Sequence, residues 1–320
     1  MHFFNLKTMG YSGTVLEYAK VKMEQCENNN TIAKELKSRF NLPQDLDIVR
    51  RWVSHVRYRN KIQASKQPVK RLFFDIETGY YTCRMWHIGK VGYVGPDMII
   101  SGKPIICISY KWQGEDVVHN LDWSMGEKEM LIEFSKVMNE ASEIVAHNCD
   151  RFDIREFRTR CIYYGILIPP TFRTLDTLKK AREYFSFASN KLDYIGKFLN
   201  VGRKMPHEGL QLWIDVVENK DPNALVTMKN YCNNDVILLE DVYHALAPYV
   251  THNTNMAVLT GGDKWHCPEC GSTDVMLANT YATQLGTIKR NMKCNNCHKQ
   301  YKVSNKTYMD MLQNIMKINL

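Results

Sequence analysis

The sequence predicts an α/β protein in which a mixed sheet flanked by helices lies between an N-terminal helical unit and a cysteine-rich C-terminal segment. Two observations favour this. Short apolar runs typical of strands begin at residue 71 and alternate with segments of helical periodicity. Four of the ten cysteines form two C-x-x-C pairs near the C-terminus, and the other six are scattered. The chain of 320 residues is 44% hydrophobic and 24% charged, which is typical of a soluble globular protein.

The sequence pattern of residues 1–66 predicts a helical unit. Apolar residues recur at helical spacing from Ile32 to Phe40, and Asn30 or Thr31 can cap this helix. The break NLPQDLD separates it from a second predicted helix, which completes a helix–turn–helix pattern.

The second helix, residues 46–62, is rich in arginine, and its predicted nucleic-acid contacts are Arg50, Arg51 and Arg57. A basic helix of this kind can lie in the groove of a duplex. Helical hairpins are also common in proteins that bind no nucleic acid, so both interpretations stay open.

The central region, residues 71–250, predicts the mixed sheet. Expected strands are 72–78, 104–112, 116–121 and 143–148, and expected helices are 126–140 and 152–164, with largely helical structure over 174–249. A glycine-containing stretch, residues 80–102, predicts a long loop or an extended hairpin directly after the first strand.

Charge is unevenly distributed over the chain, whose net charge is +8. Residues 1–70 carry 13 Lys/Arg against 6 Asp/Glu, residues 71–250 carry 21 against 24, and residues 251–320 carry 8 against 4. Basic flanks around an acidic centre suit a protein that holds an anionic polymer at a metal-dependent site. Ordinary solvated surface charge is the alternative for either flank.

The sequence also bears on localisation. No stretch approaches eighteen consecutive apolar residues, and the N-terminus lacks a signal-peptide pattern. Scattered cysteines suit a reducing compartment. We therefore expect a cytoplasmic protein without membrane partners, whose protein partners cannot be named.

The first strand of the central region ends in two acids, Asp75 and Glu77. Side chains two residues apart in a strand share one face, so these carboxylates lie side by side. Adjacent like charges raise each other's pKa unless a cation lies between them, and a hard divalent ion such as Mg²⁺ or Mn²⁺ would relieve the repulsion. A strand end that reaches solvent is the alternative interpretation.

Two further motifs follow. Asn148 and Asp153 form the pattern N-x-x-x-F-D, in which Asp153 begins a predicted helix. Asp150 lies three residues earlier, and we expect it to cap that helix. Tyr231 and Asp235 are four residues apart, which places them on one face of a helix.

Two other polar residues are notable. His147 can contact nucleic acid or serve as a structural histidine. Asp176 can cap its own helix.

The three acidic motifs, in the order Asp75 with Glu77, Asn148 with Asp153 and Tyr231 with Asp235, resemble those of the DEDD superfamily of 3′→5′ exonucleases. The resemblance is to the subgroup with a tyrosine four residues before the last aspartate, and Asp176 also matches an acidic position of related domains. KLDYIGKFLNVGRK, residues 191–204, adds to the resemblance. The resemblance implies a ribonuclease H-like fold over residues 71–250 and two bound Mg²⁺ or Mn²⁺ ions. It further implies the following roles: Asp75 bridges both ions, Glu77 and Asp235 complete one site, Asp153 serves the other, and Tyr231 orients the attacking water.

The C-terminal cysteines Cys267, Cys270, Cys294 and Cys297 have the spacing of a four-thiolate zinc site. The spacer holds strand-like residues, so residues 260–305 predict a zinc ribbon with one structural Zn²⁺, followed by a helix over 306–320. The ribbon's expected nucleic-acid contacts are Lys289, Arg290 and Lys293, and Lys299, Lys302, Tyr281 and Tyr301 extend this surface.

A nuclease domain followed by a zinc ribbon is similar to exonucleases of phage and prokaryotic genomes, which implies the cytoplasm of a prokaryotic cell or of a phage-infected host. We therefore predict a metal-dependent 3′→5′ exonuclease that acts on DNA by a two-metal-ion mechanism. An RNA exonuclease is one alternative, because the four carboxylates do not distinguish sugars. A DNA-binding regulator that uses the nuclease fold as a scaffold is another.

Overall fold

The computed structural model describes residues 15, 18–19, 21–22, 28–43, 45–51, 53–54, 70–86, 89, 93–206, 208–252 and 254–318. The chain divides into two compact units, residues 1–68 and 69–320, and each is described by itself.

The first unit contains helix α2 (Asn29–Arg39), which packs Ile32 and Leu36 into a small apolar cluster with Val49 and Val53 of a following helical segment. The predicted cap, Asn30 or Thr31, was wrong by two or three residues. Asn28 caps the helix, because its side-chain oxygen accepts the backbone N–H groups of residues 30 and 31 at 3.0 Å each.

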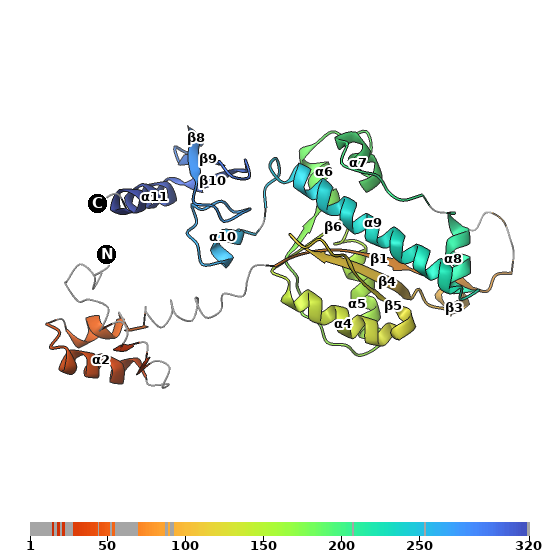
Figure 1. Cartoon of the computed structure of the whole chain (residues 1–320), viewed down its shortest axis with the longest axis horizontal. Helices are drawn as coiled ribbons and strands as arrows, with labels where there is room; N and C mark the ends of the chain where they lie inside the picture. Colours follow the sequence, from red (N-terminus) through yellow and green to blue (C-terminus); the bar gives the residue numbers. More distant parts are fainter. Residues whose placement is uncertain are drawn as a thin grey trace. The chain divides into compact units, whose positions relative to one another are not determined.

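The second unit carries the sheet and the helices around it (Figure 1), and its sequence includes the C-terminal cysteines. Its strands are β1 (Arg71–Thr78), β2 (Thr82–Cys83), β3 (Ile99–Ser101), β4 (Ile105–Trp112), β5 (His119–Asp122), β6 (Glu143–Ala146), β7 (Thr174–Asp176), β8 (Val275–Ala282), β9 (Ile288–Cys294) and β10 (Gln300–Ser304). Its helices are α4 (Glu127–Glu140), α5 (Asp153–Tyr163), α6 (Thr177–Tyr184), α7 (Leu192–Leu199), α8 (Leu210–Val217), α9 (Pro222–Leu246), α10 (Met256–Leu259) and α11 (Asn305–Ile318).

Five strands form the main sheet in the order β5-β4-β1-β6-β7. β4 pairs antiparallel with β1 and β5, whereas β6 pairs parallel with β1 and β7. Figure 1 shows α9 on one face of the sheet and α4 and α5 on the other. This mixed sheet flanked by helices confirms the predicted fold class.

The alternation of β1 decides which helix each of its side chains meets. Phe73 packs edge-on against Tyr243 of α9, with ring centroids 5.3 Å apart, whereas Phe74 packs against Phe134 of α4. Asp75 and Glu77 have the same parity as Phe73, so they face α9. The strand thus points its two acids at the helix that carries the third predicted motif.

The cysteine-rich segment forms a three-stranded antiparallel sheet of order β10-β9-β8, followed by α11. A buried ion network joins this segment to the start of β1. Arg71, 1% exposed, donates to Glu143 of β6 at 2.8 Å and to Glu269, between the first two ribbon cysteines, also at 2.8 Å. The hydroxyl of Tyr243 donates to Glu269 as well, at 2.7 Å.

Lys299 makes a second connection, which contradicts the expectation of a surface lysine. Its side chain is 1% exposed, and its ammonium group donates to the carbonyl oxygens of Ala247 and Val250, just after α9. Carbonyls beyond a helix C-terminus lack intrahelical partners and attract a cation, so burial of this lysine satisfies them.

Two smaller observations complete the fold. The expectation of largely helical structure from residue 174 missed β7, the three-residue edge strand. Among the described helices, none combines the length and apolar character that a membrane span requires.

Candidate functional site

The acids of β1 lie at the centre of the candidate site. Carboxylate oxygens of Asp75 and Glu77 and the sulfur of Cys232 all lie within 4.8 Å of one another. Cys232 belongs to α9, and its thiol donates to the backbone carbonyl of Asp75 at 3.5 Å. The end of β1 and the middle of α9 are therefore in direct contact.

α9 runs antiparallel to β1, because Tyr243 meets Phe73 while Cys232, eleven residues earlier, meets Asp75. This register brings the predicted residues Tyr231 and Asp235 to the same end of the strand. Asp235 is 1% exposed, and its charge raises the pKa of both Asp75 and Glu77.

Asp153 reaches the site from the opposite helical layer, at the first position of α5. Its carboxylate accepts a hydrogen bond from the backbone of Ile76, the residue between the two acids of β1. Asp153 is 2% exposed, and burial together with the charge of Asp75 raises its pKa.

Asp176 positions the loop that leads to Asp153. Its carboxylate caps α6 by accepting the N–H groups of residues 178 and 179, as the capping interpretation predicted. The same carboxylate accepts the N–H groups of Asn148 at 2.9 Å and of Asp150 at 3.3 Å. Asn148 adopts a left-handed backbone with φ 72°, which these bonds hold in place.

Asp150 does not cap α5, contrary to the expectation, since no side chain caps that helix. It accepts instead from Lys179 at 2.6 Å and from Thr174 at 2.7 Å. Because Asp150 is bound to these partners, it does not replace Asp153, which accepts a hydrogen bond from Ile76 of β1. His147 is similarly engaged, with its ring nitrogens 2.9 Å from the Thr177 hydroxyl and 3.0 Å from the Asn190 carbonyl, as a structural histidine would be.

Lys204 is a site residue that the sequence analysis missed. Its ammonium group donates to the Tyr231 hydroxyl at 3.0 Å and to the Asp235 carboxylate. Its backbone N–H donates to Asp193 at 2.9 Å. It ends the stretch 191–204 quoted for the family resemblance, so the signal was present in the sequence, but only the tertiary fold shows what the residue touches.

The turn that carries Lys204 depends on close packing between α7 and α9. A Cβ atom at Gly196 would lie 2.6 Å from Leu238 of α9 and 2.8 Å from the carbonyl oxygen of Gly202. Helix α7 then ends at Asn200 in a left-handed conformation with φ 57°. Gly196 and Asn200, four residues apart, therefore allow the chain to turn tightly toward the carboxylates.

The pKa values of Asp75 and Glu77 are raised, because these acids are buried and crowded together. Burial and the charge of Asp235 raise the pKa of Asp75 to about 7, although Lys204 opposes the shift. Burial and the charges of Asp75 and Asp235 likewise raise the pKa of Glu77 well above its usual range. Burial raises the pKa of Tyr231 to about 12, which keeps its hydroxyl protonated.

These residues fit divalent cations. The donor set is rich in carboxylate oxygens, which hard cations such as Mg²⁺ and Mn²⁺ prefer. Among the described residues, the Oδ1 atom of Asp153 is buried without a hydrogen-bond partner. A buried oxygen in this state, beside acids that repel one another, is stabilised when a cation binds.

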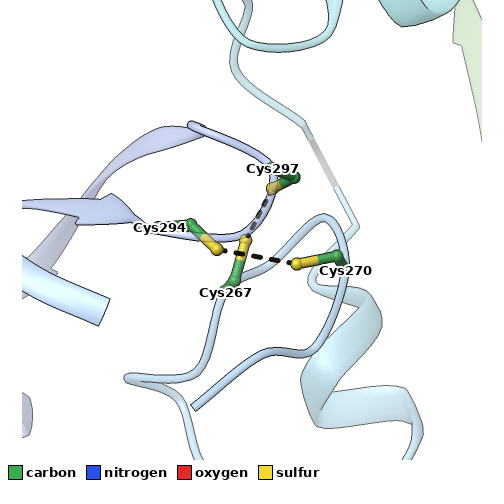
Figure 2. Close-up of side chains that lie close together, drawn as sticks. All are labelled: Cys267, Cys270, Cys294 and Cys297. Atoms are coloured by element: carbon green, nitrogen blue, oxygen red, sulfur yellow. Dashed lines mark hydrogen bonds between the residues drawn. The ribbon is translucent and has the colours of Figure 1, made fainter. Parts of the chain in front are cut away.

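The four ribbon cysteines form a second cluster (Figure 2). The sulfurs of Cys267 and Cys297 lie 3.5 Å apart, those of Cys270 and Cys294 lie 3.6 Å apart, and all four lie within 4.8 Å of one another. A disulfide requires about 2.05 Å, whereas four sulfurs at about 2.3 Å from one tetrahedral Zn²⁺ would be separated by roughly 3.8 Å. The arrangement of the four cysteines is therefore compatible with a metal site.

Both cysteine pairs sit on similar turns. Backbone N–H groups of residues 269 and 270 donate to the Cys267 sulfur, and those of residues 296 and 297 donate to the Cys294 sulfur. Such bonds stabilise thiolates. The adjoining histidines, His266 and His298, are not part of this four-sulfur cluster.

The predicted nucleic-acid contacts have varied surroundings. Arg50 and Arg51 are exposed, and Arg50 pairs with Asp47 at 3.2 Å, while Arg57 lies outside the described residues. Lys289 and Lys293 lie partly buried on β9. Arg290 is tied to the ribbon itself, because its guanidinium donates to Asn305 and Thr280 and covers the ring of Tyr308.

Part of the chain is similar to known proteins. Residues 101–247 match the family model of the RNase_H superfamily, a range that includes Asp153, Tyr231 and Asp235 but begins after β1. Among curated proteins, none matches the sequence. Solved structures similar to this chain include the family B DNA polymerase from the hyperthermophilic archaeon Pyrobaculum calidifontis, with a TM-score of 0.44 and 17% identity. That match covers 61% of this chain and 26% of the polymerase chain.

The family match and the five-stranded mixed sheet agree in the region that carries α5 and α9. The main sheet and its flanking helices therefore have a ribonuclease H-like fold.

Proposed function

We propose that this chain is a metal-dependent 3′→5′ exonuclease that hydrolyses the phosphodiester bonds of DNA. The observation that carries the proposal is the contact of Asp75 and Glu77 with α9. Their carboxylate oxygens lie within 4.8 Å of the Cys232 sulfur, and burial together with the charge of Asp235 raises their pKa values. Buried acids this close are a costly arrangement unless cations or substrate stabilise them.

The four predicted acids would hold two divalent ions. Asp75 would contact both, Glu77 and Asp235 would complete one site, and Asp153 would serve the other. Bound there, the ions would supply an activated hydroxide and a Lewis acid for the leaving 3′-oxygen.

The remaining side chains would orient the reactants. Tyr231 keeps its proton because its pKa is about 12, so its hydroxyl can donate to or accept from a water at neutral pH. Lys204 holds that hydroxyl at 3.0 Å, and its positive charge suits the developing negative charge of a phosphodiester under attack.

The appendages would hold the polymer. The exposed Arg50 and Arg51 of the first unit, and the lysines of β9, are suited to phosphate contacts. The four cysteines would bind one structural Zn²⁺, because no ligand position is left open for catalysis. The predicted limits of these parts, 1–66, 71–250, 260–305 and 306–320, belong to the same proposal.

Digestion of matched 5′-labelled substrates tests the proposal. We expect Mn²⁺ or Mg²⁺ to produce a ladder that shortens from the 3′ end of single-stranded DNA, and EDTA to abolish it. Faster digestion of the matched RNA would favour the RNA exonuclease. No cleavage combined with tight duplex binding would favour the DNA-binding regulator.

A further inference from the structure

A two-stranded hairpin that follows β1 exposes an unusual number of large apolar side chains. Strands β2 and β3 pair antiparallel, and the Arg84 N–H donates to the Met98 carbonyl at 2.8 Å. Among the described residues of this hairpin, the exposed large apolar side chains are Tyr81, Met85, Trp86, Tyr93, Ile99 and Ile100. Trp86 is 88% exposed and Tyr93 is 79% exposed, so these rings contribute little to the protein core.

The hairpin lies close to the carboxylates. Tyr81 follows Glu77 by four residues, a length of chain that spans at most about 14 Å. Two hydrogen bonds fix the chain just before the hairpin, at Thr78 and Tyr80. The Tyr80 hydroxyl donates to Glu218, next to α8, and the Trp213 indole of α8 donates to the Thr78 carbonyl at 3.0 Å. The exposed rings therefore extend from an anchored base beside the site.

We propose that Tyr81, Trp86 and Tyr93 form a stacking platform for the bases of an unpaired nucleic acid strand that leads into the carboxylate centre. This inference rests on the proposed nuclease function. Every base has a π-face, so exposed aromatic rings bind single strands without reading their sequence. Base faces inside a duplex are already stacked, so the platform selects unpaired strands.

The charge of the hairpin suits this occupant. Residues 80–102 contain two basic side chains, Arg84 and Lys90, and only one acidic side chain, Asp97. The phosphate backbone can therefore approach the rings without repulsion, whereas the neighbouring carboxylates need metal ions to accept it. A protein partner for the same apolar residues is the competing occupant, and the variants below distinguish it.

The experiment compares binding and turnover in the full-length protein. Affinity for a labelled 12-nucleotide single strand is measured by fluorescence anisotropy, and hydrolysis of the p-nitrophenyl ester of thymidine 5′-monophosphate reports the carboxylate centre without neighbouring bases. We expect Trp86→Ala and Tyr93→Ala to weaken binding about 5- to 100-fold each and to leave ester hydrolysis unchanged.

Three controls separate stacking from other effects. Trp86→Phe keeps an aromatic ring and should bind almost normally, whereas Trp86→Leu keeps only apolar surface and should bind as weakly as Trp86→Ala. Tyr163→Ala removes an equally exposed tyrosine ten residues from Asp153, roughly 15 Å along α5, and should change nothing. A strand whose 3′-terminal nucleotides are abasic should bind the wild-type protein as weakly as the intact strand binds Trp86→Ala.

The outcomes are distinguishable. Unchanged binding by Trp86→Ala and Tyr93→Ala, or full binding by Trp86→Leu, would overturn the platform even if the protein cleaves DNA, and the first result would leave a protein partner as the occupant of these apolar residues. Wild-type protein that cleaves neither the ester nor any strand with Mn²⁺ would overturn the nuclease proposal, while loss of strand binding in Trp86→Ala would still support the platform.

Discussion

The ammonium group of Lys204 lies 3.0 Å from the hydroxyl of Tyr231 and also donates to the carboxylate of Asp235. One lysine thus contacts two of the five residues that the sequence motifs predict for catalysis. Its charge opposes the mutual repulsion of the acids, since it lowers the pKa of both Asp75 and Glu77. A cation bound to Asp235 would compete with this lysine, which leads to a prediction about its role.

We expect Lys204→Met to lower kcat about 100-fold, because a positive charge near the scissile phosphate is lost. Mn²⁺ binding, measured by calorimetry, should be as tight as in the wild type or tighter, because the competing ammonium group is gone. Lys204→Arg should recover part of the rate. Lys136→Met, which removes an exposed lysine of α4, serves as the control. Loss of Mn²⁺ binding together with activity would mean that Lys204 only holds the acids in place.

Arg71 should be important for stability. Arg71→Met leaves Glu143, 1% exposed, and Glu269, 10% exposed, as buried charges without their cation, so we expect a loss of about 3–5 kcal/mol in the free energy of unfolding. Lys70→Met removes the neighbouring lysine, whose ion pair with Glu140 is exposed, and should cost less than about 1 kcal/mol. Urea denaturation measures both, and similar small losses would show that the buried network contributes little.

Cys270→Ser should reduce the zinc content of the purified protein from one atom per chain to much less, as measured by elemental analysis. Three thiolates and a hydroxyl would hold Zn²⁺ weakly, and the turn that carries Glu269 would lose the support that a bound metal gives. We therefore expect proteolysis within residues 260–305 to accelerate. Cys83→Ser changes a cysteine outside the cluster and should keep the zinc. A fully protected ribbon in zinc-free Cys270→Ser would contradict the structural role of the metal.

His252 should make stability depend on pH. Burial lowers its pKa from 6.5 to about 4, with Lys299 and Arg71 acting in the same direction and Glu269 opposing them. In the unfolded chain His252 binds a proton near pH 6.5, whereas in the folded chain it binds this proton only near pH 4. Stability is therefore complete above pH 6.5 and falls as the pH drops toward 4, by at most roughly 3 kcal/mol.

Melting temperatures at pH 7.5 and pH 5 check this expectation. The wild type should lose more stability between these values than His252→Gln, which has no proton to gain at that position. An equal loss in the two proteins would assign the pH dependence to other groups.

Much of the candidate site could be predicted from local patterns. The period of two in a strand placed Asp75 beside Glu77, and the helical period of 3.6 placed Tyr231 with Asp235. The cysteine spacing predicted a cluster that the sulfur positions support. These predictions depend on one element at a time, so they need no knowledge of how the elements pack.

The remaining features depend on contacts between distant segments. Lys299 looks like a surface residue in the sequence, and only the carbonyls beyond α9 explain its burial. Asp150 has the sequence position of a helix cap, but Lys179 and Thr174, more than twenty residues away, bind it instead. β7 is too short for a periodic pattern and exists because β6 provides a pairing edge.

The most direct test of the account is digestion of 5′-labelled single-stranded DNA by Asp235→Asn, with Asp150→Asn as the matched control. The charge of Asp235 acts on Asp75, whereas Asp150 pairs with Lys179. We predict that Asp235→Asn loses on the order of 1,000-fold of the Mn²⁺-dependent rate and that Asp150→Asn keeps most of it. Full activity in Asp235→Asn would contradict the assigned catalytic centre.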